Sequence, residues 1–324
     1  MTSPAFVDHH VHLLRVATRA RPPYDVSTPQ TIAAYHRAVA ARGSTPMDAD
    51  PEPAGVDDVR AALRDALARA SDLGLVGVTE AGMRDWAHWD ALLALREREE
   101  LAVAVRVLVA SGAARDVARV VDASAANDAR VAIAGVKLYA DGWLGPRTCA
   151  CSEAFGDVDP PDTGVLFLDA EALARRVEPL AAAGLRPATH AIGDRAIESA
   201  LDAYERVYGG QHGCRAARPR IEHAQLLRRD LVERIVELGV VCCIQPCFAA
   251  SDAKHVDATG FRDRYPLAYR WDALLDAGAR VIAGSDFPIE TLDPHAGLAA
   301  LTTGPHALDE ATALRLMTVP LDDA

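Results

Sequence analysis

The chain has 324 residues, half of them hydrophobic and a quarter charged, so it can bury a sizeable core within one large domain. Its formal net charge of −12 disfavours nucleic acid as a partner, because phosphate neutralisation requires clustered Lys and Arg. No apolar run approaches the ~20 residues that span a bilayer, and the first residues do not resemble a signal peptide. The six cysteines show no disulfide-framework spacing. We therefore expect a cytoplasmic protein that acts on a small molecule and contacts neither nucleic acid nor membrane.

Short apolar or β-branched runs alternate with longer stretches rich in Ala, Leu, Arg and Glu. In chain order, the predicted strands are residues 6–12, 76–79, 103–109, 133–139, 187–191, 220–223, 240–244 and 281–284. The predicted helices are residues 56–73, 85–100, 115–125, 170–183, 195–207, 229–238, 269–277 and 309–317. Eight strands that alternate with eight helices predict a parallel sheet.

Two folds accommodate such a sheet. At this length, eight strand–helix units favour a single closed (β/α)₈ TIM barrel over residues 1–324, since such barrels typically need ~250 residues. An open doubly wound sheet usually shows a glycine-rich phosphate loop after an early strand, and this chain has none. Two long segments, 13–55 and 141–168, follow the first and fourth predicted strands. Barrels keep their active-site loops at these strand ends, so we expect both segments to act as lids.

The sequence "VDHHVHL" places three histidines at the end of the first predicted strand. Side chains two residues apart in a strand share a face, so His10 and His12 are expected to point together into the barrel. His9 is expected to point the other way and to pack outside or hydrogen-bond locally. A His-x-His pair at a strand end is half of a metal site.

Other predicted strands end in residues of the same kind. "THAIGD" carries His190, "RIEHAQ" carries His223, "GSDFP" carries Asp286, and the fourth strand carries Lys137. Each residue alone is more simply explained as structural, but their common register at strand ends favours one shared site at the barrel mouth. Burial lowers the pKa of a lysine, and a neutral lysine can take up carbon dioxide to form a carbamate that bridges two metals.

The ordered motifs "DHHVH", "VKLYADGWLG", "THAIGD", "RIEHAQ" and "GSDFP" together resemble the amidohydrolase superfamily. Within it, the chain is most similar to amidohydrolase family 3, the YtcJ-like branch that includes N-substituted formamide deformylases. The resemblance implies a binuclear centre, usually of two zinc ions. It assigns His10, His12 and Asp286 to one metal, His190 and His223 to the other, and a carboxylated Lys137 to the bridge between them.

The chain departs from this family in two ways. Members usually carry a small accessory β-sandwich built from residues before the first barrel strand and after the last helix. Here Asp8 comes almost at the start and the sequence stops at Ala324, so we expect a barrel without the β-sandwich. A flank left uncovered in this way must either be polar or be covered by another chain, because large bare apolar patches are uncommon on soluble monomers, and we hypothesise a homodimer. The branch also often has a small residue at Trp143 and Ser at Pro146, which predicts an altered substrate pocket.

The remaining candidates have roles in catalysis or substrate binding. Asp286 is placed to take a proton from the attacking water and return it to the leaving nitrogen. Asp141, Trp143 and Arg147 follow the fourth strand and either contact substrate or only pack the loop through an Arg–Asp pair. Gln245, just after the seventh strand, is a further candidate for substrate binding. Glu222 is offset by one position from His223, so we expect it to face away from the metals and to be structural.

Three functions fit these residues. The first is hydrolysis of a non-peptide C–N bond, in an amide or N-substituted formamide, by a metal-activated hydroxide. The second is a deaminase or cyclic amide or amidine hydrolase with one metal; such relatives generally lack the strand-four lysine, so Lys137 argues against it. The third is a catalytically silent barrel that serves as a binding module, against which the intact ligand set argues.

Overall fold

A computed structural model describes residues 4–17, 27–48 and 58–323. Eight parallel strands form one sheet in the order β1 to β8, each paired with its neighbour in sequence. They are β1 (Phe6–Val11), β2 (Leu75–Met83), β3 (Ala104–Ala110), β4 (Val131–Tyr139), β5 (Pro187–Ala191), β6 (Arg220–His223), β7 (Val241–Ile244) and β8 (Arg280–Ala283). This order confirms the predicted (β/α)₈ TIM barrel.

The barrel closes where the chain after β8 meets β1. The backbone N–H of Asp286 donates to the carbonyl of His10 at 2.7 Å, and that of His12 donates to Phe287 at 2.8 Å. A parallel bridge joins Val11 to Phe287. These bonds satisfy backbone groups that would otherwise form an open edge, and they bring the ends of β1 and β8 together.

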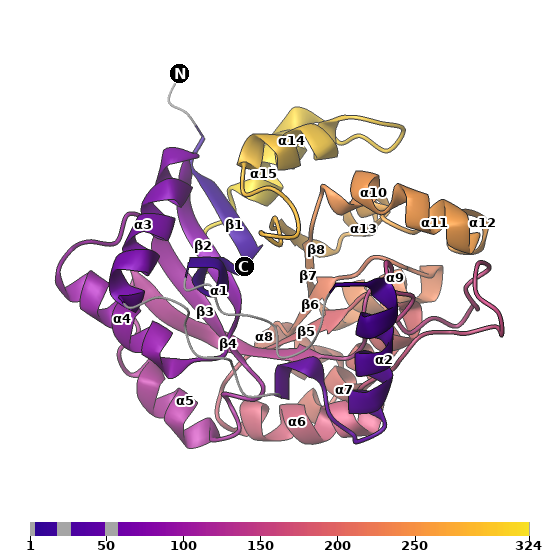
Figure 1. Ribbon diagram of the computed structural model, residues 1–324, viewed down its shortest axis with the longest axis horizontal. Helices are drawn as coiled ribbons and strands as arrows, with labels where there is room; N and C mark the ends of the chain where they lie inside the picture. Colours follow the sequence, from indigo (N-terminus) through magenta and orange to yellow (C-terminus); the bar gives the residue numbers. More distant parts are fainter. Residues whose placement is uncertain (1–3, 18–26, 49–57, 324) are drawn as a thin grey trace.

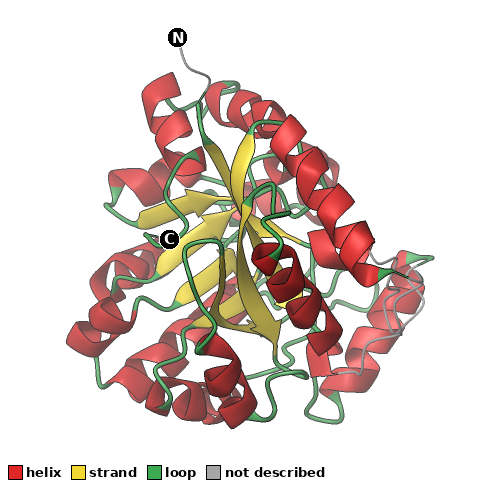
Figure 2. Cartoon of the chain, turned by 90° about the vertical axis from the view of Figure 1, so that its left-hand side faces the viewer, coloured by secondary structure: helices red, strands yellow, loops and turns green. Residues whose placement is uncertain are grey.

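Helices surround the strands on the outside (Figures 1 and 2). Those that follow the barrel repeat are α3 (Val59–Asp72), α4 (Trp86–Glu97), α5 (Val117–Ser124), α6 (Ala170–Ala182), α7 (Asp194–Tyr208), α9 (Arg229–Leu238), α13 (Trp271–Asp276) and α15 (Glu310–Met317). In α3, the carboxylate of Asp58 caps the N-terminus by accepting from the N–H of Ala61, and Leu63, Leu67 and Ala70 form one buried stripe. Helical spacing of apolar residues thus directs this helix onto the sheet.

The described residues also contain helices that the sequence pattern did not predict. Short elements interrupt the long segment after β1: α1 (Leu13–Ala17), α2 (Pro29–Ala40) and the 3₁₀ turn η1 (Pro46–Asp48). Others are α8 (Gln211–Ala217), α10 (Phe248–Ser251), α11 (Ala253–Thr259), α12 (Phe261–Arg264) and α14 (Pro294–Thr302). Parts of the predicted lid 13–55 and the start of the predicted helix 56–73 lie outside the described residues. None of the helices described is long and apolar enough to cross a membrane.

The two faces of the strands pack into separate apolar clusters. On β7, Cys242 and Ile244 belong to the large apolar core shared with the helices, whereas Val241 and Cys243 form a separate cluster with Ile282 of β8. Alternate residues of a strand point to opposite faces, so this second cluster lies inside the barrel. The barrel interior is packed rather than open.

The segment after α15 covers the N-terminal end of the barrel. Val319 packs against the interior apolar cluster, and a Cβ at Gly77 of β2 would lie only 2.7 Å from the side chain of Leu321. The guanidinium of Arg106 on β3 holds the carboxylate of Asp322 at 2.7 Å. The chain's last described residues therefore close the end of the barrel opposite to the strand C-termini.

Candidate metal centre

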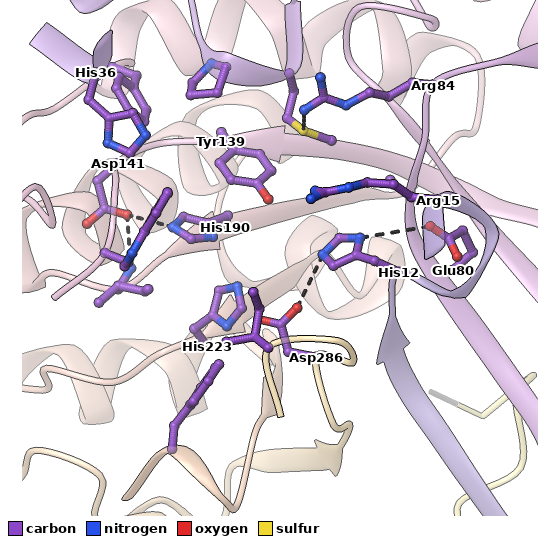
Figure 3. Close-up of a pocket in the computed structure, with 18 of the residues that line it drawn as sticks. His12, Arg15, His36, Glu80, Arg84, Tyr139, Asp141, His190, His223 and Asp286 are labelled. Atoms are coloured by element: carbon purple, nitrogen blue, oxygen red, sulfur yellow. Dashed lines mark hydrogen bonds and ion pairs between the residues drawn. The ribbon is translucent and has the colours of Figure 1, made fainter. Parts of the chain in front are cut away.

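Three candidate ligands meet where β1 ends and β8 leads into its loop. Figure 3 shows two of them, His12 and Asp286, side by side. Nε2 of His10 and Nε2 of His12 lie 3.5 and 3.2 Å from Oδ1 of Asp286. One potential ligand atom from each residue lies within 4.8 Å of the others. His10 and His12 share a face, as their spacing predicts, but β1 is irregular between Asp8 and Val11.

The other candidate ligands come from β4, β5 and β6. The ring centroids of His190 and His223 are 4.5 Å apart, and the ring of His223 lies 4.9 Å from that of His10. Lys137 is fully buried. Burial and then the charge of Lys137 lower the pKa of His10, whereas burial, then His223 and then Lys137 lower the pKa of His190. The structure therefore brings together all six residues singled out as ligands.

Three of the imidazoles have one ring nitrogen occupied by an oxygen acceptor. Nδ1 of His10 lies 2.5 Å from Glu222, Nδ1 of His223 lies 2.7 Å from Oε1 of Gln245, and Nε2 of His190 lies 2.9 Å from the carbonyl of Gly142. Because each partner accepts, the occupied nitrogen carries the proton and the other nitrogen keeps its lone pair. Metal-ligating histidines are held in this way.

Several buried polar atoms in the cluster have no hydrogen-bond partner among the described residues. They are Nε2 of His10, Nδ1 of His190, Nζ of Lys137 and Oδ1 of Asp286. Buried polar atoms are normally satisfied, and leaving several together unsatisfied is costly. Imidazole lone pairs and a carboxylate oxygen are ligands that zinc prefers, so the donor set fits a divalent cation.

Burial and mutual charge set the protonation of the cluster. Burial alone would raise the pKa of Asp286, but the imidazoles of His10 and His12 outweigh it and lower that pKa. Burial, followed by the charge of His10, lowers the pKa of His223 to about 3. Burial also lowers the pKa of Lys137. The carboxylate is thus ionised and His223 is neutral near pH 7, which are the forms that bind metals.

The expectation that Glu222 faces away from the cluster was wrong. Its carboxylate points into the barrel and contacts His10 of β1, which is not a neighbour of β6 in the sheet. The strand ends in left-handed backbone, with φ of 81° at His223 and 46° at Ala224. That turn interrupts the alternation of side chains, so Glu222 and His223 both face the site.

The structure gives the remaining candidates different surroundings. Asp141 accepts backbone N–H groups of Ala150, Ile192 and Gly193, which ties the loop after β4 to the end of β5. Arg147 pairs with Asp157 and donates to backbone carbonyls of its own loop. Of the two roles that the sequence allowed, these contacts are those of loop packing. Gln245 holds His223, and His9 contacts the carbonyl of Val319 at 3.1 Å instead of joining the cluster. Of the loop candidates, Asp141 and Trp143 line the cavity, and Arg147 does not.

The sequence model of the amidohydrolase family matches residues 44–319. This chain belongs to the amidohydrolase family. It is 37% identical over 170 residues to the putative amidohydrolase YtcJ of Bacillus subtilis, a match covering 52% of this chain and 31% of that protein. It is 34% identical over 163 residues to the protein LONG AFTER FAR-RED 3 of Arabidopsis thaliana, covering 50% and 28%. The matched segments span about a third of these relatives.

Solved structures share the fold of this amidohydrolase. An uncharacterized metal-dependent hydrolase from Pyrococcus furiosus superimposes with a TM-score of 0.72 at 23% identity, covering 97% of this chain and 80% of that one. Its counterpart from Pyrococcus horikoshii gives a TM-score of 0.72 at 24% identity, covering 97% and 79%. Both agree with the eight-stranded barrel seen here.

A cavity of about 350 Å³ opens above the cluster of this amidohydrolase. His12, His190, His223 and Asp286 line its floor. Its wall includes residues that sequence reasoning missed, among them Arg15, Met47, Glu80, Arg84, His88, Tyr139 and Phe167. Glu80 and Arg84 come from the end of β2, so the strand-end rule that found the ligands would have found them too. Arg15 and Met47 come from the segment after β1, where no periodic signal marks them.

Proposed function

We propose that this amidohydrolase is a metal-dependent hydrolase that cleaves a non-peptide C–N bond in an amide or N-substituted formamide. The observation that carries the proposal is the set of buried ligand-type atoms on His10, His190, Lys137 and Asp286 that have no hydrogen-bond partner among the described residues and lie beside a small cavity. Membership of the amidohydrolase family adds support.

The donor set suits two divalent ions, and we propose zinc. His10, His12 and Asp286 would hold one ion, His190 and His223 the other, with a carboxylated Lys137 shared between them. Bound there, the ions would supply an acidified water and polarise the scissile carbonyl. A carbamate would also replace the buried ammonium, which is unfavourable beside cations, by an anionic pair of oxygens.

The protein's own groups carry the proton and shape the substrate site. Asp286 is ionised and lies at the cavity floor, so it can accept the proton of the attacking water and return it to the leaving nitrogen. Trp143 lies edge-on to His36 at 4.8 Å and narrows the wall on the side of β4. The cavity volume suits a small substrate whose reacting group is shielded from bulk water.

A substrate screen on zinc-reconstituted protein tests this proposal. The panel contains N-substituted formamides, linear amides, cyclic amides and amino-substituted heterocycles, each run with metal-stripped protein as the control. Release of an amine and a carboxylate from a linear amide, with two bound metals by elemental analysis, is the expected result. Ammonia release from heterocycles with one bound metal would favour the deaminase alternative. Zinc binding without turnover of any class would favour a binding module and overturn the proposal.

A further inference from the structure

A buried ion pair lies inside the barrel directly beneath the candidate metal centre. Arg220 and Glu222, two residues apart on β6, face the interior, with Nε of the arginine 2.9 Å from Oε1 of the glutamate. The side chains are 3% and 0% exposed. The second carboxylate oxygen of Glu222 accepts from Nδ1 of His10 at 2.5 Å. One carboxylate thus joins a cation from its own strand to a candidate ligand from β1.

Arg220 makes a second connection across the barrel. Its Nη2 donates to the backbone carbonyl of His9 at 3.1 Å, next to His10 in the chain. The backbone carbonyl of Arg220 accepts from the buried hydroxyl of Tyr204, on α7, at 2.8 Å. The pair therefore holds both the imidazole of His10 and the backbone that carries it.

Packing alone does not account for charges at this position. Removing two charges from water costs several kcal/mol per ion, and a buried ion pair is often no more stabilising than apolar residues of the same volume. The neighbouring interior positions Val241, Cys243 and Ile282 show that apolar side chains fill this level of the barrel. Apolar residues could not replace two contacts of this pair: Glu222 with His10, and Arg220 with the carbonyl of His9.

We propose that Glu222 is a positioning residue that fixes the protonation and orientation of His10, with Arg220 holding its carboxylate in place. An acceptor at Nδ1 forces the proton onto that nitrogen, so Nε2 presents its lone pair to the metal centre. The inference rests on the proposed function in that it assigns a metal to His10. Neither Arg220 nor Glu222 belongs to the proposed ligand set, and the inference gives both a role in holding one of its members.

Two substitutions separate the charge of Glu222 from its hydrogen bond. Glu222→Gln keeps the shape of the side chain, but its amide can donate as well as accept, so it no longer selects one tautomer of His10. Glu222→Ala removes the acceptor altogether. Asp194→Asn is the matched control, because Asp194 is also fully buried, pairs with Arg228 at 2.7 Å and bonds to none of the six candidate ligands.

The first measurement is the zinc dissociation constant, from competition with a chromophoric chelator, with thermal unfolding of the metal-free proteins in parallel. We expect the dissociation constant to rise by about 10- to 100-fold in both Glu222 variants. Asp194→Asn should lower thermal stability without changing zinc affinity. An unchanged zinc dissociation constant in folded Glu222→Gln would overturn the inference.

The second measurement uses metal-free protein and the ¹⁵N chemical shifts of the imidazoles. We expect His10 to be a single Nδ1–H tautomer in the wild type and in Asp194→Asn, and a mixture in Glu222→Gln. If the wild type fails to bind zinc while His10 still shows the single tautomer, the proposed function fails and the positioning contact stands. A mixture of tautomers in the wild type would reject the positioning role directly.

Discussion

The phenol ring of Tyr139 lies flat against the imidazole of His190, with ring centroids 4.4 Å apart and planes inclined by 10°. Tyr139 follows Lys137 by two residues on β4, so both side chains face the site. We expect Tyr139→Leu to weaken zinc binding up to about tenfold, because aromatic stacking contributes about 0.5–1.5 kcal/mol. Tyr139→Phe keeps the stack and should bind zinc as the wild type does. Equal losses in the two variants would mean that the hydroxyl, and not the stack, supports His190.

Asp286→Asn should reduce kcat by at least about a hundredfold while zinc content stays mostly intact. The amide cannot accept the water's proton, and general acid–base catalysis contributes roughly 10²–10⁴-fold. Elemental analysis and steady-state kinetics on the same preparation measure both quantities. A variant with near wild-type kcat would remove Asp286 from the proton-transfer role, whatever its metal content.

Lys137→Gln should lower the number of bound metals, because an amide cannot form a carbamate. Wild-type protein stripped of metal should reload zinc faster with added bicarbonate, since burial lowers the pKa of Lys137 and so favours the neutral amine, the form that reacts with carbon dioxide. The variant, reloaded under the same conditions, should show no response to bicarbonate. Full two-metal loading of the variant would show that no carbamate is needed.

The ion pair between Asp48 and Arg176 should make folding stability depend on pH. Burial opposes ionisation of Asp48, but Arg176, with help from Thr45 and Ser111, lowers its pKa from 3.8 to about 2. A lowered carboxyl pKa stabilises the fold above pH 3.8, and this contribution is lost as the pH falls towards 2. Asp48→Asn should therefore lower the free energy of unfolding by about 2 kcal/mol at pH 7.

Urea unfolding of Asp48→Asn and the wild type at pH 7 and pH 3 measures this difference, which should shrink at the lower pH. Asp65→Asn serves as the control, because the Arg64–Asp65 pair is largely exposed and should contribute little. A difference that stays constant with pH would mean that Asp48 acts through packing and not through its charge.

We propose a homodimer that covers an apolar groove between α1, α3 and the loop after β8. Leu13, Val16, Leu73 and Phe287 line this groove, and Val16 and Leu73 are more than a third exposed. Light scattering at micromolar concentration should give about twice the monomer mass of 34.5 kDa. Leu73→Lys should shift the population towards monomer. A wild-type monomer mass that does not change with concentration would contradict the proposal.

Much of the fold was predictable because its signals are local and repeated. The predicted strand 220–223 matches β6 to the residue, and the predicted helix 229–238 matches α9. The helices α10 to α12 after β7 were not predicted, because each is only one or two turns long and too short to show a periodic pattern. The helix α2 depends on a local cap at Thr28 within a segment rich in turn-forming residues.

The candidate site, like the fold, was only partly predictable from the sequence. A strand-end rule suffices to bring His190 and Asp286 to one mouth, because parallel strands end on the same side. It could not place Glu222, since alternation holds only while the backbone stays extended, and the left-handed turn at His223 breaks it. Contacts across the barrel, such as Arg220 to His9, depend on the closed geometry and leave no pattern in the sequence.

The bonds that secure β1 have a consequence for biosynthesis. β1 is made before its partners on one side, Asp286 and Phe287, and before Val319, whose carbonyl contacts His9. Until those residues emerge from the ribosome, β1 has one unpaired edge, and such an edge is prone to pair with other chains. A metal site that uses both His10 and Asp286 can form only after the segment that follows β8 has been made. A nascent chain that stalls before this segment would therefore expose both an unpaired strand edge and ligands without metal.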